Sequence, residues 1–175
     1  DLSGLEVETA GDNGRAFILR DKLSMFLKEN SFNYSHVFID CPPSLSLLTV
    51  MALVASNSLI VPLQTEFFAL EGLTQLVKTI DRVKDNLNSN LSIRGIILTM
   101  YDKRNKLSSQ VEKEARDYFK DKVYKTVIPR NVRLSEAPSH GIPVLIYDKS
   151  CPGSKSYLSL TEEFLNQEKI MESAA

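Results

Sequence analysis

The residues of this chain best suited to chemistry lie around Asp40. An apolar run, His36–Ile39, ends in that single carboxylate, and Cys41 and two prolines follow it. A buried strand that ends in an Asp is how nucleotide-binding α/β folds hold Mg²⁺, usually through a water molecule. The pattern therefore predicts that Asp40 is the catalytic and magnesium-holding carboxylate of a Walker-B-like site. The competing interpretation is that Asp40 only caps a helix or begins a turn.

A site of this kind also needs a phosphate-binding loop of the form G-x-x-x-x-G-K-[ST], whose amides and lysine cradle the phosphates. None of the seven glycines of the sequence opens such a loop. The glycines that precede Asp40 are Gly4, Gly11 and Gly14. We therefore interpret the sequence as one half of a nucleotide site, with the phosphate-binding half expected upstream.

Other polar residues follow the predicted strands directly. These groups are Gln64–Glu66, Tyr101–Lys106 and Pro129–Arg133. Because the carboxyl ends of parallel strands meet at one edge of a sheet, we expect these groups to lie together, and ligands bind at that edge. The cations among them, Lys103, Arg104, Lys106, Arg130 and Arg133, predict a local basic patch for a polyanion. The competing interpretation is that these are solvated loop charges.

Hydrophobic periodicity predicts the elements that must position these residues. Helices are expected over 16–29, 45–55, 69–87 and 155–167, and another after a capping box formed by Ser109 and Glu112. Strands are expected over 36–40, 58–63, 93–100, 123–128 and 143–147. Strands that alternate with helices predict an α/β fold with an open, mostly parallel, doubly wound sheet flanked by helices.

Composition sets the limits of the function. At 175 residues, with 43% hydrophobic and 25% charged residues, we expect one domain over residues 1–175. The net charge of -1 gives no global attraction to polyanions. The two cysteines are far apart, which argues against a disulfide framework or zinc site and favours a reducing cytoplasm. With two histidines and no G-x-S-x-G elbow, a Ser-His-Asp triad is not indicated.

With these residues assembled, the chain resembles the ParA/Soj family of chromosome- and plasmid-partitioning ATPases, the deviant Walker A class. The resemblance is carried by I-D-C-P-P-S at 39–44, E-F-F-A-L-E-G at 66–72, L-T-M at 98–100 and the long segment 128–141. It implies a P-loop NTPase-like fold in which this chain is the carboxyl-terminal part. A complete member would carry the phosphate-binding loop before Asp1, so we expect this fragment alone to be inactive.

The resemblance also implies an activity and its parts. ATP with Mg²⁺ would drive formation of a homodimer that binds double-stranded DNA without sequence preference, and a ParB-like partner would stimulate hydrolysis. Met100 and Pro129, Arg130 and Asn131 fall where the family encloses adenine. Arg104 and Arg133 match positions that contact DNA, with Lys103 and Lys106 beside them. The expected location is the cytoplasm, on the nucleoid. The sequence departs from the family pattern at Ser46 and at 150–153.

Two other interpretations stay open. The chain could be a non-enzymatic remnant or interaction domain from a split ParA-like gene. It could also be a flavodoxin-like regulatory domain with Asp40 in an acidic pocket, which would leave the loop 129–141 without a role. The tail, residues 166–175, is short and acidic on balance, unlike the basic amphipathic helix of membrane-recruited relatives, so we expect no membrane binding.

Overall fold

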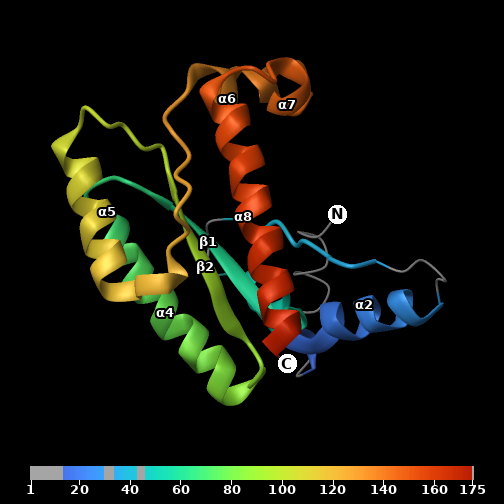
Figure 1. The fold of residues 1–175 in the computed structure, drawn as a ribbon. Helices are drawn as coiled ribbons and strands as arrows, with labels where there is room; N and C mark the ends of the chain where they lie inside the picture. Colours follow the sequence, from blue (N-terminus) through green and yellow to red (C-terminus); the bar gives the residue numbers. More distant parts are fainter. Residues whose placement is uncertain (1–13, 30–33, 43–45, 175) are drawn as a thin grey trace. The chain divides into compact units, whose positions relative to one another are not determined.

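The computed structural model describes residues 14–29, 34–42 and 46–174 (Figure 1). The chain divides into two compact units. The first comprises Asp1–Leu59 and Leu76–Ser92, and the second comprises Ile60–Gln75 and Ile93–Ala175. That residues 1–175 form one domain stays a prediction.

Helices dominate the described chain. In order, the elements are the 3-10 turn η1 Arg15–Phe17, α2 Ile18–Glu29, α3 Leu47–Ala55, β1 Ser58–Gln64, α4 Ala69–Asn86, β2 Ser92–Thr99, α5 Lys106–Phe119, the 3-10 turn η2 Lys120–Lys122, α6 Val132–Glu136, the 3-10 turn η3 Ala137–His140, α7 Val144–Tyr147 and α8 Pro152–Ala174. The five helices predicted from periodicity are confirmed as α2, α3, α4, α5 and α8, because each presents an apolar face that packing can cover.

A buried helix and one asparagine organise the first unit. Residues 51–54 of α3 are buried, and α2 packs against this helix. Beyond the end of α4, the side-chain amide of Asn88 donates to the carbonyl oxygens of Leu53 (2.9 Å) and Ser56 (2.7 Å). Carbonyl groups at a helix carboxyl end have no partner inside the helix. Asn88 therefore ties the loop after α4 to the end of α3.

The strands β1 and β2 pair in parallel. The amide of Ser92 donates to the carbonyl of Asn57 at the start of the pair, and the amide of Thr65 donates to the carbonyl of Thr99 at its end. Both strands therefore run in the same direction and end together. Such pairing needs a crossover connection, which here is α4. The predicted class, an α/β fold with a parallel sheet flanked by helices, is confirmed, and Figure 1 shows α5 and α8 beside the strand pair.

The predicted strand over 123–128 is only partly formed. This backbone runs parallel to β2 and makes isolated bridges at Val123 and Pro129. The amides of Tyr124 and Ile128 donate to carbonyl oxygens of β2 at 2.9 and 2.8 Å. Between these bonds, residues 125–127 are not assigned as strand. The segment nevertheless brings Pro129 and Arg130 to the carboxyl end of β2.

One buried cluster of the second unit lies where α8 covers this segment. Tyr124, Ile128 and Leu160 form a buried cluster, against which Ile97, Leu134 and Phe164 pack. Gly95 is required beneath it, since a Cβ atom at this position would overlap the ring of Tyr124. Further along α8, Glu168 forms an ion pair with Arg94 of β2, whose side chain is only 9% exposed.

Two predicted strands are wrong. Residues 36–40 are not assigned as strand, and Val37 and Phe38 are 49% and 73% exposed. An extended segment becomes a strand only through ladder hydrogen bonds, and none of the described strands pairs with this segment. Residues 144–147 form the helix α7 instead of a strand. Pro143 precedes it, with its carbonyl accepting from the amides of Ile146 and Tyr147.

The helix predicted to begin at a capping box of Ser109 and Glu112 starts earlier in the sequence. α5 begins at Lys106, earlier than Ser109 and Glu112 imply, and the side chain of Asn105 accepts a hydrogen bond from the amide of Leu107 at 3.0 Å. Asn is among the preferred residues at this position because its oxygen satisfies an amide left without a helical partner. The helix start therefore lies directly after the loop that leaves β2.

Candidate functional site

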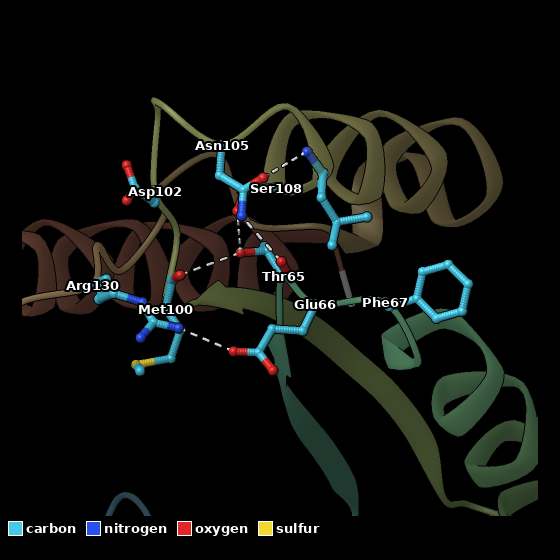
Figure 2. Close-up of a pocket in the computed structure, with 9 residues that line it drawn as sticks. Thr65, Glu66, Phe67, Met100, Asp102, Asn105, Ser108 and Arg130 are labelled. Carbon is cyan, nitrogen blue, oxygen red and sulfur yellow. Dashed lines mark hydrogen bonds and ion pairs between the residues drawn. The ribbon is translucent and has the colours of Figure 1, made fainter.

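A pocket of about 520 Å³ lies in the second unit, where β1 and β2 end. Its lining residues are Thr65, Glu66, Phe67, Met100, Asp102, Asn105, Leu107, Ser108 and Arg130 (Figure 2). They come from the loops after both strands, from the start of α5 and from the segment after residue 128. Predicted groups from separate parts of the sequence, 64–66, 101–106 and 129–133, thus contribute to one pocket.

Two buried hydroxyl groups form one wall of the pocket. Thr65 is 1% exposed and Ser108 is 2% exposed. The Thr65 hydroxyl lies 3.2 Å from Ser108 Oγ and 3.4 Å from the carbonyl oxygen of Met100, and the Ser108 hydroxyl donates to the carbonyl of Thr65 (3.4 Å). Buried hydroxyl groups need such partners because desolvation without them is costly. The bonds join β1, β2 and α5 at the pocket.

Met100 has an unusual backbone at the end of β2. Its φ is +53°, in the left-handed region. For a residue with a Cβ atom this conformation costs about 1–2 kcal/mol. Backbone strain of this kind clusters at binding sites. Here it turns the chain out of β2, so that Met100 and Asp102 both face the pocket (Figure 2).

An ion pair stands on another side of the pocket. Arg130 Nη2 lies 3.0 Å from Glu66 Oε1, and both side chains are more than half exposed. The backbone of Arg130 is held separately, by its amide donating to the carbonyl of Tyr101 at 3.0 Å. An exposed pair contributes little stability, about 0–1 kcal/mol. The guanidinium and carboxylate therefore remain able to exchange partners with a ligand.

Asp102 extends this charged rim. Its carboxylate accepts from Arg104 Nε at 3.1 Å and from Nη2 at 3.0 Å, and also from the Arg104 amide at 3.0 Å. These hydrogen bonds, with Arg130 acting electrostatically, lower the pKa of Asp102 to about 2. Asp102 is thus ionised at neutral pH, and Arg104 is 91% exposed despite the pair.

Arg133, the other predicted DNA residue, is paired as well. It lies in the first turn of α6, where the Asn131 side chain caps the helix by accepting from the Arg133 amide at 3.1 Å. Its guanidinium donates to Glu136 at 2.8 Å and lies 3.6 Å from an oxygen of Asp148. Hydrogen bonding to Glu136 raises the pKa of Arg133. Lys103 and Lys106 are exposed.

The structure therefore sorts the predicted site residues. Met100 and Arg130 line the pocket, while Pro129 forms the bridge beside it. Asn131 acts as a helix cap, and Arg104 and Arg133 are exposed arginines bound to carboxylates. Thr65, Glu66 and Asp102 were predicted to lie at the ligand-binding edge, but no individual role was assigned to them. Ser108 was not predicted to be part of the site, because no local pattern marks it.

Asp40 belongs to the first unit, where it is exposed and lies outside any helix or strand. The neighbouring residues 43–45 of the I-D-C-P-P-S segment lie outside the described residues. In the part of the chain that the structure describes, no three His, Cys, Asp or Glu side chains gather in a group that could hold a metal ion. A single exposed carboxylate still fits the water-mediated contact by which proteins commonly bind Mg²⁺. That Asp40 has this role stays a prediction.

No helix in the described ranges is both long enough and apolar enough to cross a membrane.

Comparisons with known proteins agree along the chain. A family model described as AAA domain matches residues 1–93. The chain is 54% identical to the chromosome partitioning protein ParA of Caulobacter vibrioides over 175 residues, which are 100% of this chain and 65% of that protein. It is 50% identical to the chromosome-partitioning ATPase Soj of Treponema pallidum over 165 residues, 94% of this chain and 64% of that protein.

A solved structure shows the same fold. Cobyrinic acid a,c-diamide synthase of Mycobacterium smegmatis, determined with a bound ATP analog and magnesium, matches with a TM-score of 0.74 at 30% identity, over 97% of this chain and 60% of that one. The predicted P-loop NTPase-like fold is thereby confirmed. The chain spans about 65% of the length of the first of these relatives. From the family model over more than half of its residues, the chain belongs to the AAA-domain family, and within that family it is a relative of the ParA and Soj proteins named above.

Proposed function

We propose that this chain is part of an ATP-driven partitioning switch: the complete protein binds ATP and Mg²⁺, forms a homodimer, binds double-stranded DNA without sequence preference, and hydrolyses ATP when a ParB-like partner engages it. The observation that carries the proposal is the 54% identity to a ParA protein over the whole chain. The alternative is a non-enzymatic remnant, which would neither bind nor hydrolyse ATP in the first test below.

The pocket supports the nucleotide part of this proposal. Its volume of about 520 Å³ lies within the range of about 300–1,000 Å³ typical of small-molecule sites. Met100 offers an apolar surface for a flat ring, and Arg130, Glu66 and Asn105 offer donors and acceptors at its edge. The position at the carboxyl ends of parallel strands is where α/β folds bind nucleotides. We assign the base and sugar of ATP to this pocket.

We assign magnesium to Asp40, in the first unit. In the complete protein, Asp40 would hold Mg²⁺ through a water molecule, and the ion would neutralise charge on the phosphates. Among this chain's own residues, Met100 and Arg130 would bind and orient the base, and Asp40 would hold the water shell of the ion.

A first test concerns hydrolysis by the complete protein that contains this chain. We expect Mg²⁺-dependent ATP turnover that Asp40→Ala lowers at least tenfold, with binding of a fluorescent ATP analogue largely retained. Asp21→Ala, which removes an exposed carboxylate of α2, serves as the control. Phosphate release and analogue fluorescence measure the two effects. Full turnover in the Asp40 variant would contradict the assignment of this carboxylate.

A second test concerns DNA. With a non-hydrolysable ATP analogue bound, we expect the double variant Arg104→Ala, Arg133→Ala to lose at least tenfold in affinity for duplexes of any sequence, because arginines that contact phosphate carry no sequence information. Arg82→Ala removes one exposed positive charge from α4 and is the control. Fluorescence anisotropy with two unrelated duplexes measures the effect. Unchanged affinity in the double variant would remove these arginines from the DNA surface.

A further inference from the structure

The guanidinium of Arg104 is already occupied by a carboxylate of its own loop. Asp102 accepts from Nε and from Nη2 of Arg104 with its two oxygens, at 3.1 and 3.0 Å. This two-point geometry is the one that a phosphate group also uses with arginine. A duplex phosphate and Asp102 therefore compete for the same donors.

The pair does not hold the loop together by itself. The backbone of this loop is fixed by the Arg104 amide, which donates to Asp102 Oδ1, and by the Asn105 amide, which donates to the Asp102 carbonyl at 3.0 Å. Asn105 then caps α5. The side-chain pair can consequently open while the backbone bonds keep the loop in place.

The surroundings of the pair favour competition. Arg104 is 91% exposed, so a phosphate can reach it without moving the fold. The neighbouring Lys103 and Lys106 are exposed cations. Among the ion pairs described for this structure, none joins either lysine to a carboxylate in the way that Asp102 is joined to Arg104. The charged groups that act on Asp102 are Arg104 and, more weakly, Arg130 across the pocket. Its low pKa, about 2, means that acidification within the neutral range does not release Arg104.

We propose that Asp102 is a built-in competitor for Arg104, which weakens the binding of a duplex phosphate backbone to this loop. The inference rests on the proposed DNA binding and names the residue that limits it. Phosphate binding must first displace the carboxylate, which then remains close to the phosphate and repels it. Removing the charge of Asp102 therefore strengthens DNA binding, although Asp102 neighbours the predicted contact residues.

The variant Asp102→Asn tests this step. Asparagine keeps an oxygen for the Arg104 amide and so preserves the loop, but it loses the charge and the two-point contact. In the complete protein, saturated with a non-hydrolysable ATP analogue, we expect duplex affinity to rise about two- to fivefold, as the release of an exposed ion pair allows. The slope of log affinity against log salt becomes steeper by about 0.9, the value for one added phosphate contact.

Two comparisons isolate the cause. Asp121→Asn, in the turn η2, changes the net charge equally at an exposed site outside the loop, and we expect it to leave both quantities unchanged. In an Arg104→Ala background, Asp102→Asn should give no gain, because the competitor has lost its target. The affinity of each variant for the ATP analogue is also measured, so that duplex binding is compared between proteins that are all saturated with the analogue.

The outcomes separate the two proposals. If the wild-type protein binds duplex and Asp102→Asn binds it equally or more weakly, the competitor role is overturned and DNA binding stands. An equal gain from Asp121→Asn, or a gain that persists without Arg104, also overturns it. If neither the wild-type protein nor Asp102→Asn binds duplex with the nucleotide present, the proposed DNA binding fails and this inference fails with it.

Discussion

Met100 shows how a single residue can serve the site at a cost to the fold. Its φ of +53° is strained, and its carbonyl oxygen lies 3.4 Å from the buried Thr65 hydroxyl. A glycine would adopt this backbone without strain. The Met100 side chain lines the pocket, whereas its strained backbone affects the stability of the fold. A substitution at this position can therefore test the effect on binding and the effect on stability separately.

At the residue scale we predict opposite effects of Met100→Gly on stability and on binding. Relief of the left-handed strain should leave the thermal stability equal or raise it, by at most about 1–2 kcal/mol. Loss of the apolar surface should weaken ATP-analogue binding several-fold. Unfolding curves and fluorescence titrations of the complete protein measure the two effects. Leu107→Ala, another pocket residue but at the start of α5, is the comparison. Undiminished analogue binding by the glycine variant would show that Met100 does not contact the nucleotide.

At the scale of elements, α8 holds the partly formed third strand in place. The two oxygens of Glu163 accept from the amides of Lys125 (2.7 Å) and Thr126 (2.9 Å). These amides lie between the bridges at Val123 and Pro129, in a stretch that is not assigned as strand, so the carboxylate takes the place of a neighbouring strand. Partial burial tends to raise the pKa of Glu163, but these hydrogen bonds outweigh it and the net pKa is lowered.

We predict that Glu163→Gln destabilises the protein by about 1–3 kcal/mol, because a carboxamide has one acceptor oxygen and hydrogen bonds to a charged group are strong. Its neighbour Glu162 is exposed, so Glu162→Gln is the matched control. Thermal unfolding measures the loss. A loss no larger than that of the control would mean that the backbone bonds to β2 suffice to hold residues 125–126.

The same carboxylate gives a pH dependence of known sign. Because the folded-state pKa of Glu163 lies below its unfolded value, ionised Glu163 adds stability at neutral pH, and this stability is lost as the pH falls through the folded-state pKa. The difference between wild type and Glu163→Gln should therefore shrink in acid. A difference that stays constant or widens below the ordinary Glu range would contradict the lowered pKa.

At the scale of the molecule, the described chain carries the pocket at the ends of β1 and β2 in one unit and Asp40 in the other. The printed sequence contains no G-x-x-x-x-G-K-[ST] loop. We therefore predict that residues 1–175 alone show no ATP turnover above the blank in a phosphate-release assay, because most contacts to a triphosphate come from such a loop. The same chain with Asp40→Ala is the control. Turnover that Asp40→Ala abolishes would refute this prediction.

The sequence by itself determined the features that depend on neighbours along the chain. Helical periodicity located α2, α3, α4, α5 and α8, and the alternation of helices with apolar runs indicated the parallel α/β class. The position of polar residues after strands predicted that residues 64–66, 101–106 and 129–133 lie together, and members of all three groups line one pocket. These signals are local, because an apolar stripe or a strand end is visible in a short window of residues.

Only the tertiary structure decided which polar groups meet and which extended segments pair. Glu66 and Arg130 are far apart in sequence yet form one ion pair, and Thr65 shares a buried hydrogen bond with Ser108. Residues 36–40 have a strand-like pattern but do not pair with either described strand, and residues 144–147 form a helix. The physical reason is that a hydrogen bond forms only where two groups come close in space. For groups far apart in the sequence, the folded chain as a whole sets the distance between them, and no local pattern encodes it.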